Sequence, residues 1–219
     1  MPKGLYYEVV GTGYPLVFLH GNGEDHNIFN NQINYFKDKY QLILIDTIMH
    51  GKSNYSYRKY NFYELAILVI NVLKKEKIDK ANFVGFSDGA NILLHLSLLN
   101  KDIVNKAVLI SGNINPRGLK FKTYLSTKLL EYKYLLTRNT KYYFYYLMGS
   151  QPKLKFKQLN KINNDFLVIA GAQDVIKLSH TKKLSNKLNA SLTIIENGNH
   201  FSLINKAKEV NNIIEEYLK

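Results

Sequence analysis

The stretch ANFVGFSDGANILLHL, residues 81–96, decides how the rest of the chain is interpreted. Residues 81–86 form a short β-rich run, and an apolar helical stretch begins at Gly89. Between them stands Gly-Phe-Ser-Asp-Gly, with Ser87 in a strand-to-helix turn. A side chain at Gly85 or Gly89 would collide with neighbouring backbone in such a turn. The motif therefore predicts that Ser87 is a nucleophile, raised above a sheet edge at the N-terminus of the next helix, whose dipole favours developing negative charge.

The rest of the chain alternates β-rich runs with helical stretches. We predict strands over Leu5–Val10, Leu16–His20, Gln41–Asp46, Ala81–Phe86, Val104–Ser111, Phe166–Ala170 and Ser191–Ile195. We predict helices over Ile28–Tyr40, Phe62–Lys75, Gly89–Asn100, His180–Leu188 and Asn205–Leu218. The strand at residues 42–45 has no polar face, which indicates burial on both sides. The fold class is therefore α/β, with a doubly wound, mainly parallel sheet.

The composition limits the classes of protein that fit. A chain of 219 residues with 46% hydrophobic and 21% charged residues suits one globular domain with a substantial core. The absence of cysteine excludes a disulfide framework, a thiolate nucleophile and a cysteine-based metal site. The first residues contain no apolar signal region, so we expect a cytoplasmic protein.

Residues 113–164 interrupt the alternation and hold most of the excess charge. They contain nine Lys, two Arg and a single acid, Glu131, which gives +10 of the chain's +13. They also contain 10 of its 28 Phe and Tyr residues. We predict that residues 1–112 and 165–219 form the core and that 113–164 form a basic, aromatic-rich helical cap.

Codon bias explains abundant lysine but not its clustering in residues 113–164. A role for the cluster is to attract an anionic substrate, with Lys153, Lys155 and Lys157 on one side of an extended segment. Weak peripheral contact with an anionic membrane surface is another role. Nucleic-acid binding is not expected, because no nucleic-acid-binding motif accompanies the basic residues. The oligomeric state is left open.

A serine nucleophile needs a base and an acid that orients the base. Asp174 follows the predicted strand 166–170, and His200 follows the predicted strand 191–195. Both lie past strand ends, in the chain order Ser, acid, His. Asp165 lies at the wrong end of its strand, and Glu196 is very close in sequence to His200. We therefore predict a catalytic triad of Ser87, His200 and Asp174.

A developing oxyanion needs two backbone N–H donors. We expect one from Asp88, the residue after the nucleophile, and one from Asn22 in the loop His20-Gly21-Asn22-Gly23. The Asp88 carboxylate has two interpretations: it caps the start of its own helix, or it points into the pocket and recruits a substrate ammonium group.

These motifs together resemble the α/β-hydrolase superfamily. The resemblance rests on the 20–23 loop, Asp46 followed by Gly51-Lys52-Ser53, the 85–89 elbow, Gly171-Ala172-Gln173-Asp174 and Gly198-Asn199-His200-Phe201. It covers the chain except for residues 113–164, which match the family's variable cap after the sixth family strand. It implies an eight-stranded type of sheet, no cofactor and an acyl-enzyme route. The chain departs from the family at Met49, where glycine is frequent, and starts at what is usually the second strand.

The resemblance implies a serine hydrolase, carboxylesterase-like, that acts on a small ester with an apolar part. Thioester, amide or peptide and carbon–carbon bond hydrolysis stay open, because the same triad serves all of them. A non-catalytic ligand-binding member of the family is the alternative from another class. No metal site is expected.

Overall fold

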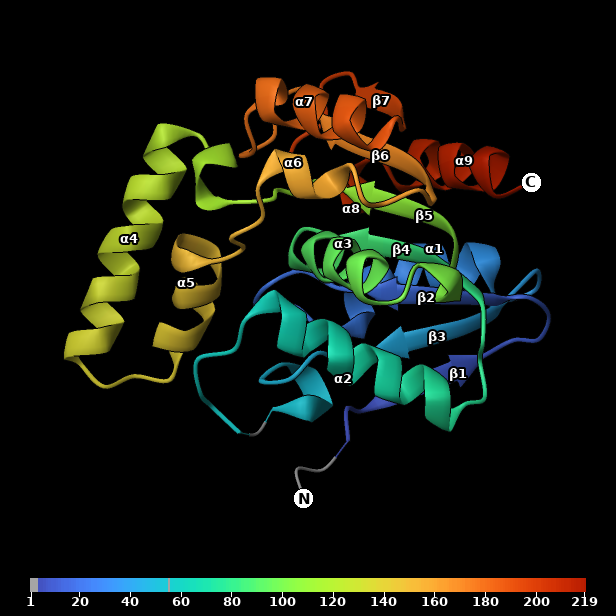
Figure 1. Ribbon diagram of the computed structural model, residues 1–219, viewed down its shortest axis with the longest axis horizontal. Helices are drawn as coiled ribbons and strands as arrows, with labels where there is room; N and C mark the ends of the chain where they lie inside the picture. The colour runs from blue at the N-terminus through green and yellow to red at the C-terminus, as the bar shows by residue number, and fades with distance from the viewer. Residues whose placement is uncertain (1–3, 55) are drawn as a thin grey trace.

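The computed structural model describes residues 4–54 and 56–219, and its centre is a seven-stranded sheet (Figure 1). The strands are β1 (Tyr7–Val10), β2 (Pro15–Leu19), β3 (Gln41–Ile45), β4 (Ala81–Phe86), β5 (Val104–Ile110), β6 (Asp165–Gly171) and β7 (Ser191–Ile195). Their order in the sheet is β1-β3-β2-β4-β5-β6-β7. Only β1 runs antiparallel to its neighbour among these described strands. The sheet is therefore mainly parallel, as the sequence predicts.

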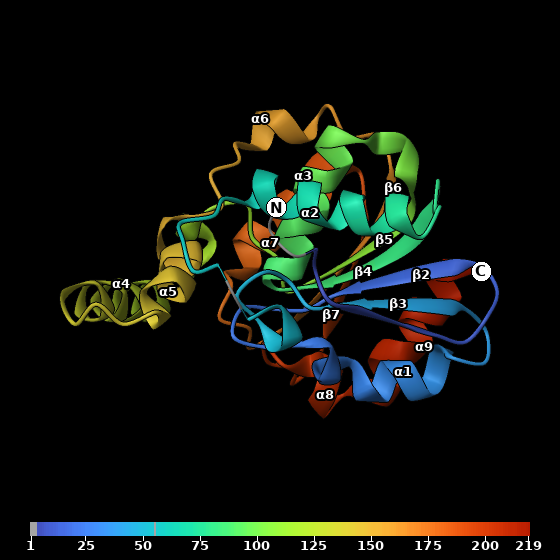
Figure 2. The ribbon, with the colours of Figure 1, turned by 90° about the horizontal axis from the view of Figure 1, so that it is seen from below.

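Helices cover both faces of the sheet, as Figure 2 shows. They are α1 (Asn30–Phe36), α2 (Phe62–Lys75), α3 (Asp88–Leu99), α4 (Phe121–Leu136), α5 (Lys141–Ser150), α6 (Phe156–Leu159), α7 (Leu178–Leu188), α8 (Ser202–Asn205) and α9 (Ala207–Leu218). On one face lie α2, α3, α6 and α7, and on the other lie α1, α8 and α9. This is the doubly wound arrangement expected from the alternation of strands and helices.

Consecutive strand residues face opposite layers. In β2, Val17 and Leu19 pack with α2 and α3, whereas Leu16 and Phe18 pack with Phe29 and the α1 and α9 side. The side chains of these four residues are fully buried. Burial on both faces explains why these strands show apolar runs without polar alternation.

The seven predicted strands all occur, with boundaries that differ by at most two residues. Two helix predictions need correction. The predicted helix Ile28–Tyr40 is a 3-10 turn over His26–Phe29 followed by α1, which ends at Phe36 because the chain turns there toward β3. The predicted helix Asn205–Leu218 is divided at Lys206, whose φ of −127° separates α8 from α9.

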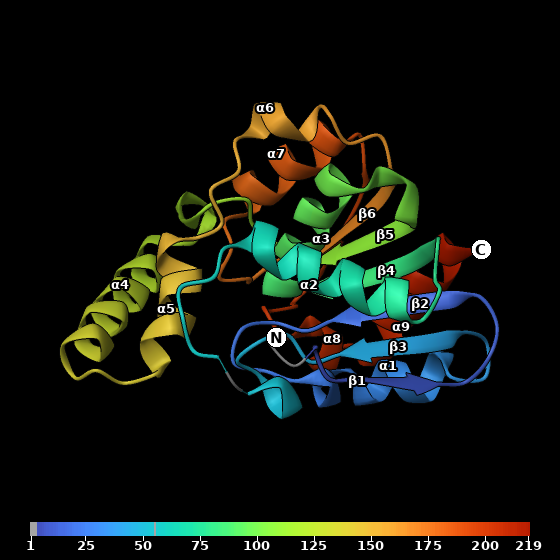
Figure 3. The same ribbon diagram turned by 60° about the horizontal axis from the view of Figure 1, so that its bottom comes forward.

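Residues 113–164 leave the sheet after β5 and return before β6. They form a 3-10 turn over Pro116–Gly118 and then α4, α5 and α6. Helices α4 and α5 pack side by side and project beyond the ends of the strands, which Figure 3 shows on the left. Among the described residues, no helix is long and apolar enough to cross a lipid bilayer.

The turn between β4 and α3 is strained and tightly packed. Ser87 has φ 51° and ψ −113°, outside the regions that side-chain-bearing residues favour. A Cβ on Gly89 would lie 1.9 Å from the carbonyl oxygen of Leu19, and one on Gly85 would lie 2.6 Å from the carbonyl oxygen of Gly89. Both glycines are thus required by neighbouring backbone, which cannot move as a side chain can.

We expect Gly89→Ala to lower the free energy of unfolding by about 3 kcal/mol or more, because its methyl group would overlap the β2 backbone. Chemical denaturation followed by circular dichroism measures the change. Ser126→Ala, on the exposed surface of α4, is the control and should change stability by less than about 0.5 kcal/mol. Equal stability of Gly89→Ala and the parent would show that Gly89 does not pack this closely against the β2 backbone.

Candidate active site

Three side chains from three different strand ends meet at one edge of the sheet. Ser87 follows β4, Asp174 follows β6 and His200 follows β7. His200 Nε2 lies 3.1 Å from Ser87 Oγ, and His200 Nδ1 lies 2.8 Å from Asp174 Oδ1. The structure therefore brings together the three residues that the sequence places in a triad. A neutral His200 with its proton on Nδ1 donates to Asp174 and accepts from the Ser87 hydroxyl.

Asp174 is 2% exposed and is held as a carboxylate by several donors. Burial opposes its ionisation, but hydrogen bonds from His200, from the Ser111 hydroxyl and from the Ile176 N–H outweigh burial and lower the Asp174 pKa. Ser111 Oγ donates to Asp174 Oδ2 at 2.5 Å. Ser111 was not predicted from the sequence, although it directly follows β5 at the same sheet edge.

Neither competing acid is near His200 in the way that a triad requires. Asp165 is the first residue of β6 and so begins the strand at the opposite edge. Glu196 follows β7 and is exposed. The His200 ring is fixed instead by Phe86, with ring centroids 5.1 Å apart, and by Phe201 at 5.5 Å.

The two amides expected to hold an oxyanion both border Ser87. Asp88 is the first residue of α3, and the first N–H groups of a helix have no partner within that helix. Gly21 precedes Asn22 and lies so close that a Cβ there would be 3.2 Å from Ser87 Cβ. The 20–23 loop and the start of α3 therefore approach the serine from two sides.

The Asp88 carboxylate is buried in a network of side-chain amides. Its Oδ2 accepts from Asn22 Nδ2 at 2.9 Å, and its Oδ1 accepts from Asn91 Nδ2 at 3.2 Å. Asn91 also contacts Asn113, and Asn22 Nδ2 also donates to the carbonyl of Phe144 in α5. The interpretation of this carboxylate as a cap of its own helix is wrong, because its hydrogen-bond donors are the side-chain amides of Asn22 and Asn91 and not backbone N–H groups of α3. Burial raises the Asp88 pKa to about 6.

A second acid, Glu24, which no prediction from the sequence included, directly follows the 20–23 loop. Burial raises the Glu24 pKa, a neighbouring Asp25 raises it further, and His200 lowers it, so Glu24 is within electrostatic reach of the triad. Glu24 lines a hollow of about 320 Å³ together with His50 and Phe144, whose rings stack with centroids 4.7 Å apart. The surroundings of Ser87 thus carry acidic groups. No sequence motif marks Glu24.

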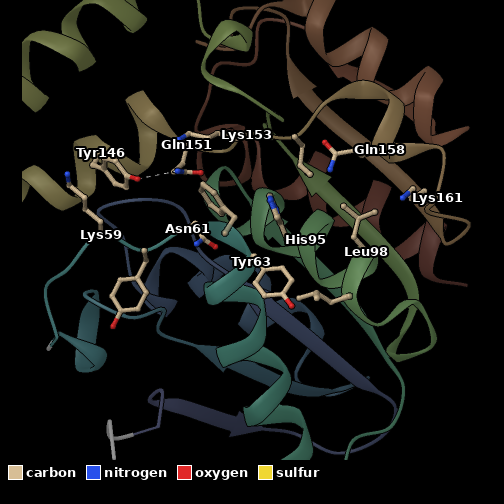
Figure 4. Close-up of a pocket in the computed structure, with 14 residues that line it drawn as sticks. Lys59, Asn61, Tyr63, His95, Leu98, Tyr146, Gln151, Lys153, Gln158 and Lys161 are labelled. Atoms are coloured by element: carbon tan, nitrogen blue, oxygen red, sulfur yellow. Dashed lines mark hydrogen bonds between the residues drawn. The ribbon is translucent and has the colours of Figure 1, made fainter.

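Lysines line a different pocket, of about 790 Å³, between α2, α3 and residues 146–161 (Figure 4). Lys59, Lys153 and Lys161 surround it, and His95 faces it from α3. None of the predicted triad or oxyanion residues lines this pocket. Lys155 lines another pocket, beside α4, which also lacks them. Lys153 and Lys155 therefore line pockets that do not include Ser87.

The described residues contain no group of three or more His, Asp and Glu side chains placed to hold a metal ion.

A family model described as the α/β hydrolase fold matches residues 14–127. The chain belongs to this family. Among solved structures, an esterase of Exiguobacterium antarcticum has a TM-score of 0.85 at 20% identity, covering 97% of this chain and 94% of that one. A structure titled "Est816 as an N-Acyl homoserine lactone degrading enzyme" has a TM-score of 0.83 at 22% identity, covering 97% and 96%.

Curated relatives are similar over part of their length. Strigolactone esterase D14 of Arabidopsis thaliana is 29% identical over 127 residues, which are 56% of this chain and 47% of that protein. Karrikin insensitive 2 receptor B of Petunia hybrida is 26% identical over 122 residues, which are 53% of this chain and 44% of that protein. The matched segment thus spans less than half of either relative, and the two relatives are named for different roles.

The buried Asp88 predicts a pH-dependent effect on stability. Its pKa is about 6 in the folded protein against 3.8 ordinarily, so the folded state holds the proton over a wider pH range than the unfolded state. Folding is therefore penalised as pH rises from about 4 to above 6. We expect Asp88→Asn to gain stability relative to the parent over this window, by roughly 2 to 3 kcal/mol in total, and no further above pH ~7.

Thermal and chemical unfolding of both proteins from acid to mildly alkaline pH measures this difference. Asp38→Asn, at an exposed turn, is the matched control and should show a flat difference. If the difference in free energy of unfolding between Asp88→Asn and the parent also does not change with pH, burial does not raise the pKa of Asp88.

Proposed function

We propose that this protein is a serine hydrolase, carboxylesterase-like, that cleaves a small carboxylic ester through an acyl-enzyme intermediate. The observation that carries the proposal is the hydrogen-bonded chain from Ser87 through His200 to Asp174, formed at a strained turn beside two candidate oxyanion amides. Nucleophile, base and orienting acid in this geometry are what acyl transfer needs. Family membership and esterase structures of the same fold support it.

In the first half of the reaction, His200 Nε2 takes the proton from Ser87 Oγ as the oxygen attacks the ester carbonyl carbon. The carbonyl oxygen becomes an oxyanion, which the N–H groups of Asn22 and Asp88 stabilise. Asp174 keeps the proton of His200 on Nδ1 and stabilises the imidazolium that forms. The imidazolium then gives its proton to the leaving alcohol, and Ser87 remains acylated.

The second half repeats these roles with water. His200 takes a proton from a water molecule, which attacks the acyl carbon and again forms an oxyanion. Collapse of this intermediate breaks the bond to Ser87 Oγ, which regains the proton from His200. The proposed reaction uses only side chains and amides of this chain together with water, and it includes no cofactor.

Residues 113–164 form the proposed cap over this site, and residues 1–112 and 165–219 form the proposed core. The contact that supports this division is between α5 and the 20–23 loop, where the Phe144 carbonyl accepts from Asn22 and its ring stacks on His50. The cap thus reaches the loop that supplies an oxyanion donor. The aromatic ring of Phe144 there suits an ester with an apolar part.

The charge around Ser87 favours a neutral or ammonium-bearing ester over an anionic one. Asp88 and Glu24 lie beside the site, whereas Lys153 and Lys155 line other pockets. A carboxylate on the substrate would meet like charge at short range. Thioester, amide and carbon–carbon bond cleavage stay as alternative reactions of the same triad. A cytoplasmic location is also proposed, since a chain without cysteine suits a reducing compartment.

We expect Ser87→Ala and His200→Ala to fold normally and to reduce kcat on a small aryl ester by roughly 10⁶. Asp174→Asn should cost on the order of 10⁴, because it favours the wrong tautomer of His200. Initial rates on a p-nitrophenyl ester measure all three. Glu196→Gln is the matched control and should retain parental activity. Near-normal turnover by Ser87→Ala would overturn the proposal. A large loss of activity in Glu196→Gln, with Asp174→Asn unaffected, would identify Glu196 as the acid of the triad in place of Asp174.

Covalent labelling separates an enzyme from a ligand receptor of the same fold. An organophosphate should modify Ser87 stoichiometrically in the parent, with the site identified by mass spectrometry, and should not label Ser87→Ala. A parent that binds small ligands but neither reacts with the organophosphate nor turns over esters, thioesters or amides would favour the receptor.

Three p-nitrophenyl esters that differ in charge test the substrate class. At mildly alkaline pH we expect kcat/KM to be at least as high for the alanyl as for the propionyl ester, and lower for the succinyl ester. Asp88→Asn and Glu24→Gln should each reduce the differences in kcat/KM among the three esters by several-fold, since either change removes a nearby negative charge. Asp38→Asn is the control. A salt-sensitive preference for the succinyl ester, lost on changing Lys153, Lys155 and Lys157 to Gln, would instead support anionic steering.

A further inference from the structure

Helix α4 is the outermost element of the molecule, and only one of its sides is covered. It packs against α5 and projects beyond the body of the protein, as Figures 1 and 2 show. Its buried residues are Thr127 and Glu131, both polar. Glu131 accepts from Lys128 and from the Ser150 hydroxyl of α5. The inward side of this helix is thus held by polar contacts and by the ring of Tyr134, which stacks on Tyr145 of α5 with centroids 5.3 Å apart.

The outward side of α4 is apolar along its whole length. The α4 stripe consists of Phe121, Leu125, Leu129, Tyr132 and Leu136, which are 72%, 47%, 62%, 62% and 65% exposed. Their spacing of i, i+4, i+8, i+11 and i+15 places them on one face of a 3.6-residue helix. Leu135 and Tyr124, also exposed, widen the face.

This arrangement is the reverse of an ordinary surface helix, whose apolar stripe faces the core. Single exposed apolar residues need no explanation, but a contiguous row over four turns marks a binding surface. The stripe does not belong to the proposed active site, because α5 lies between α4 and the 20–23 loop that Phe144 contacts. Burial of this row against a partner would be favourable, because it removes apolar side chains from water.

The charges around the stripe are positive. At 100° per residue, Lys122 and Lys133 lie beside the stripe along one edge, and Lys120, Arg138 and Lys141 lie at the two ends of the helix. All five are exposed. The only acid between residues 113 and 164 is Glu131, which is buried and paired with Lys128. The outward surface of α4 therefore combines apolar side chains with cations and no carboxylate.

We propose that the outward face of α4 docks on the surface of a bilayer that contains anionic phospholipid. The helix would lie in the interfacial plane, with the stripe among the upper acyl chains and the lysines at the phosphates, as interfacial amphipathic helices do. Its 16 residues extend about 24 Å and are too few to span a bilayer. The proposal does not depend on the activity of Ser87.

Charge complementarity favours this occupant over a second copy of the chain. A two-fold contact through the stripe would bring two identical basic surfaces together, each within a segment of net charge +10. Such like-charge contact is unfavourable, whereas an anionic bilayer attracts each nearby lysine by about 1 kcal/mol. The two aromatic side chains of the stripe, Phe121 and Tyr132, also suit the headgroup region.

Sedimentation of the full chain with lipid vesicles tests the proposal. We expect binding to vesicles of phosphatidylcholine mixed with phosphatidylserine, at least tenfold weaker binding to phosphatidylcholine alone, and loss of affinity as salt rises above about 0.15 M. Leu129→Gln/Leu136→Gln should weaken binding about tenfold or more, because it removes apolar area from the stripe. Lys122→Gln/Lys133→Gln should weaken binding to the anionic vesicles and flatten the salt dependence.

The matched control is Ile67→Gln/Ile204→Gln, which changes two exposed apolar residues on α2 and α8 and should bind like the parent. Circular dichroism and ester hydrolysis in solution, expected to be unchanged in all variants, verify that each is folded. Failure of the parent to bind anionic vesicles would overturn the proposal, as would equal binding by the stripe variant. Light scattering that shows a dimer abolished by Leu129→Gln/Leu136→Gln, without vesicle binding, would assign the stripe to a second copy.

Discussion

The close approach of the Ser87 turn to strand β2 is the constraint on which the rest of the site depends. Gly89 packs against the carbonyls of Leu19 and His20 at distances that no side chain would allow, and Ser87 takes a positive φ as a result. The same contact sets the 20–23 loop beside the serine and directs the start of α3 at it. Because β4 lies at the middle of the sheet, between β2 and β5, the ends of β6 and β7 can deliver Asp174 and His200 from the other side. Backbone packing thus positions the chemistry before any side-chain hydrogen bond forms.

Much of this could be inferred from the sequence, because parallel strands buried on both faces leave a distinctive pattern of apolar runs, and loops after such strands converge at one edge. The five central strands, β2 to β6, and the convergence of the three proposed triad residues follow from that rule. The same rule also applies to Ser111, which directly follows β5. Glu24 and the amide network around Asp88 could not be predicted in this way, since their roles depend on which side chains the loops turn inward. The helix predicted over Ile28–Tyr40 was too long because a helical apolar pattern does not show where the chain must turn toward the next strand.

Charge is separated in space across this molecule, although the net charge alone suggests one basic surface. Glu24 and Asp88 lie in the loop after β2 and at the start of α3, whereas residues 113–164, between β5 and β6, carry +10 of the net charge. At physiological salt, charges more than about 8 Å apart in solvent are largely screened from one another. The two regions can therefore act on different molecules. A total of +13 describes neither of them.

The inward side of α4 is attached by buried Thr127 and Glu131 and by the Tyr134 ring, which stacks on Tyr145 of α5. The side chains on its outward side are exposed, so substitutions there are expected to have little effect on folding. Selection on that face therefore comes mainly from whatever it contacts. The helix can acquire a new surface, or lose one, while Ser87, His200 and Asp174 stay in place. Over evolutionary time, the proposed docking surface on α4 and the proposed chemistry at Ser87 can therefore change independently.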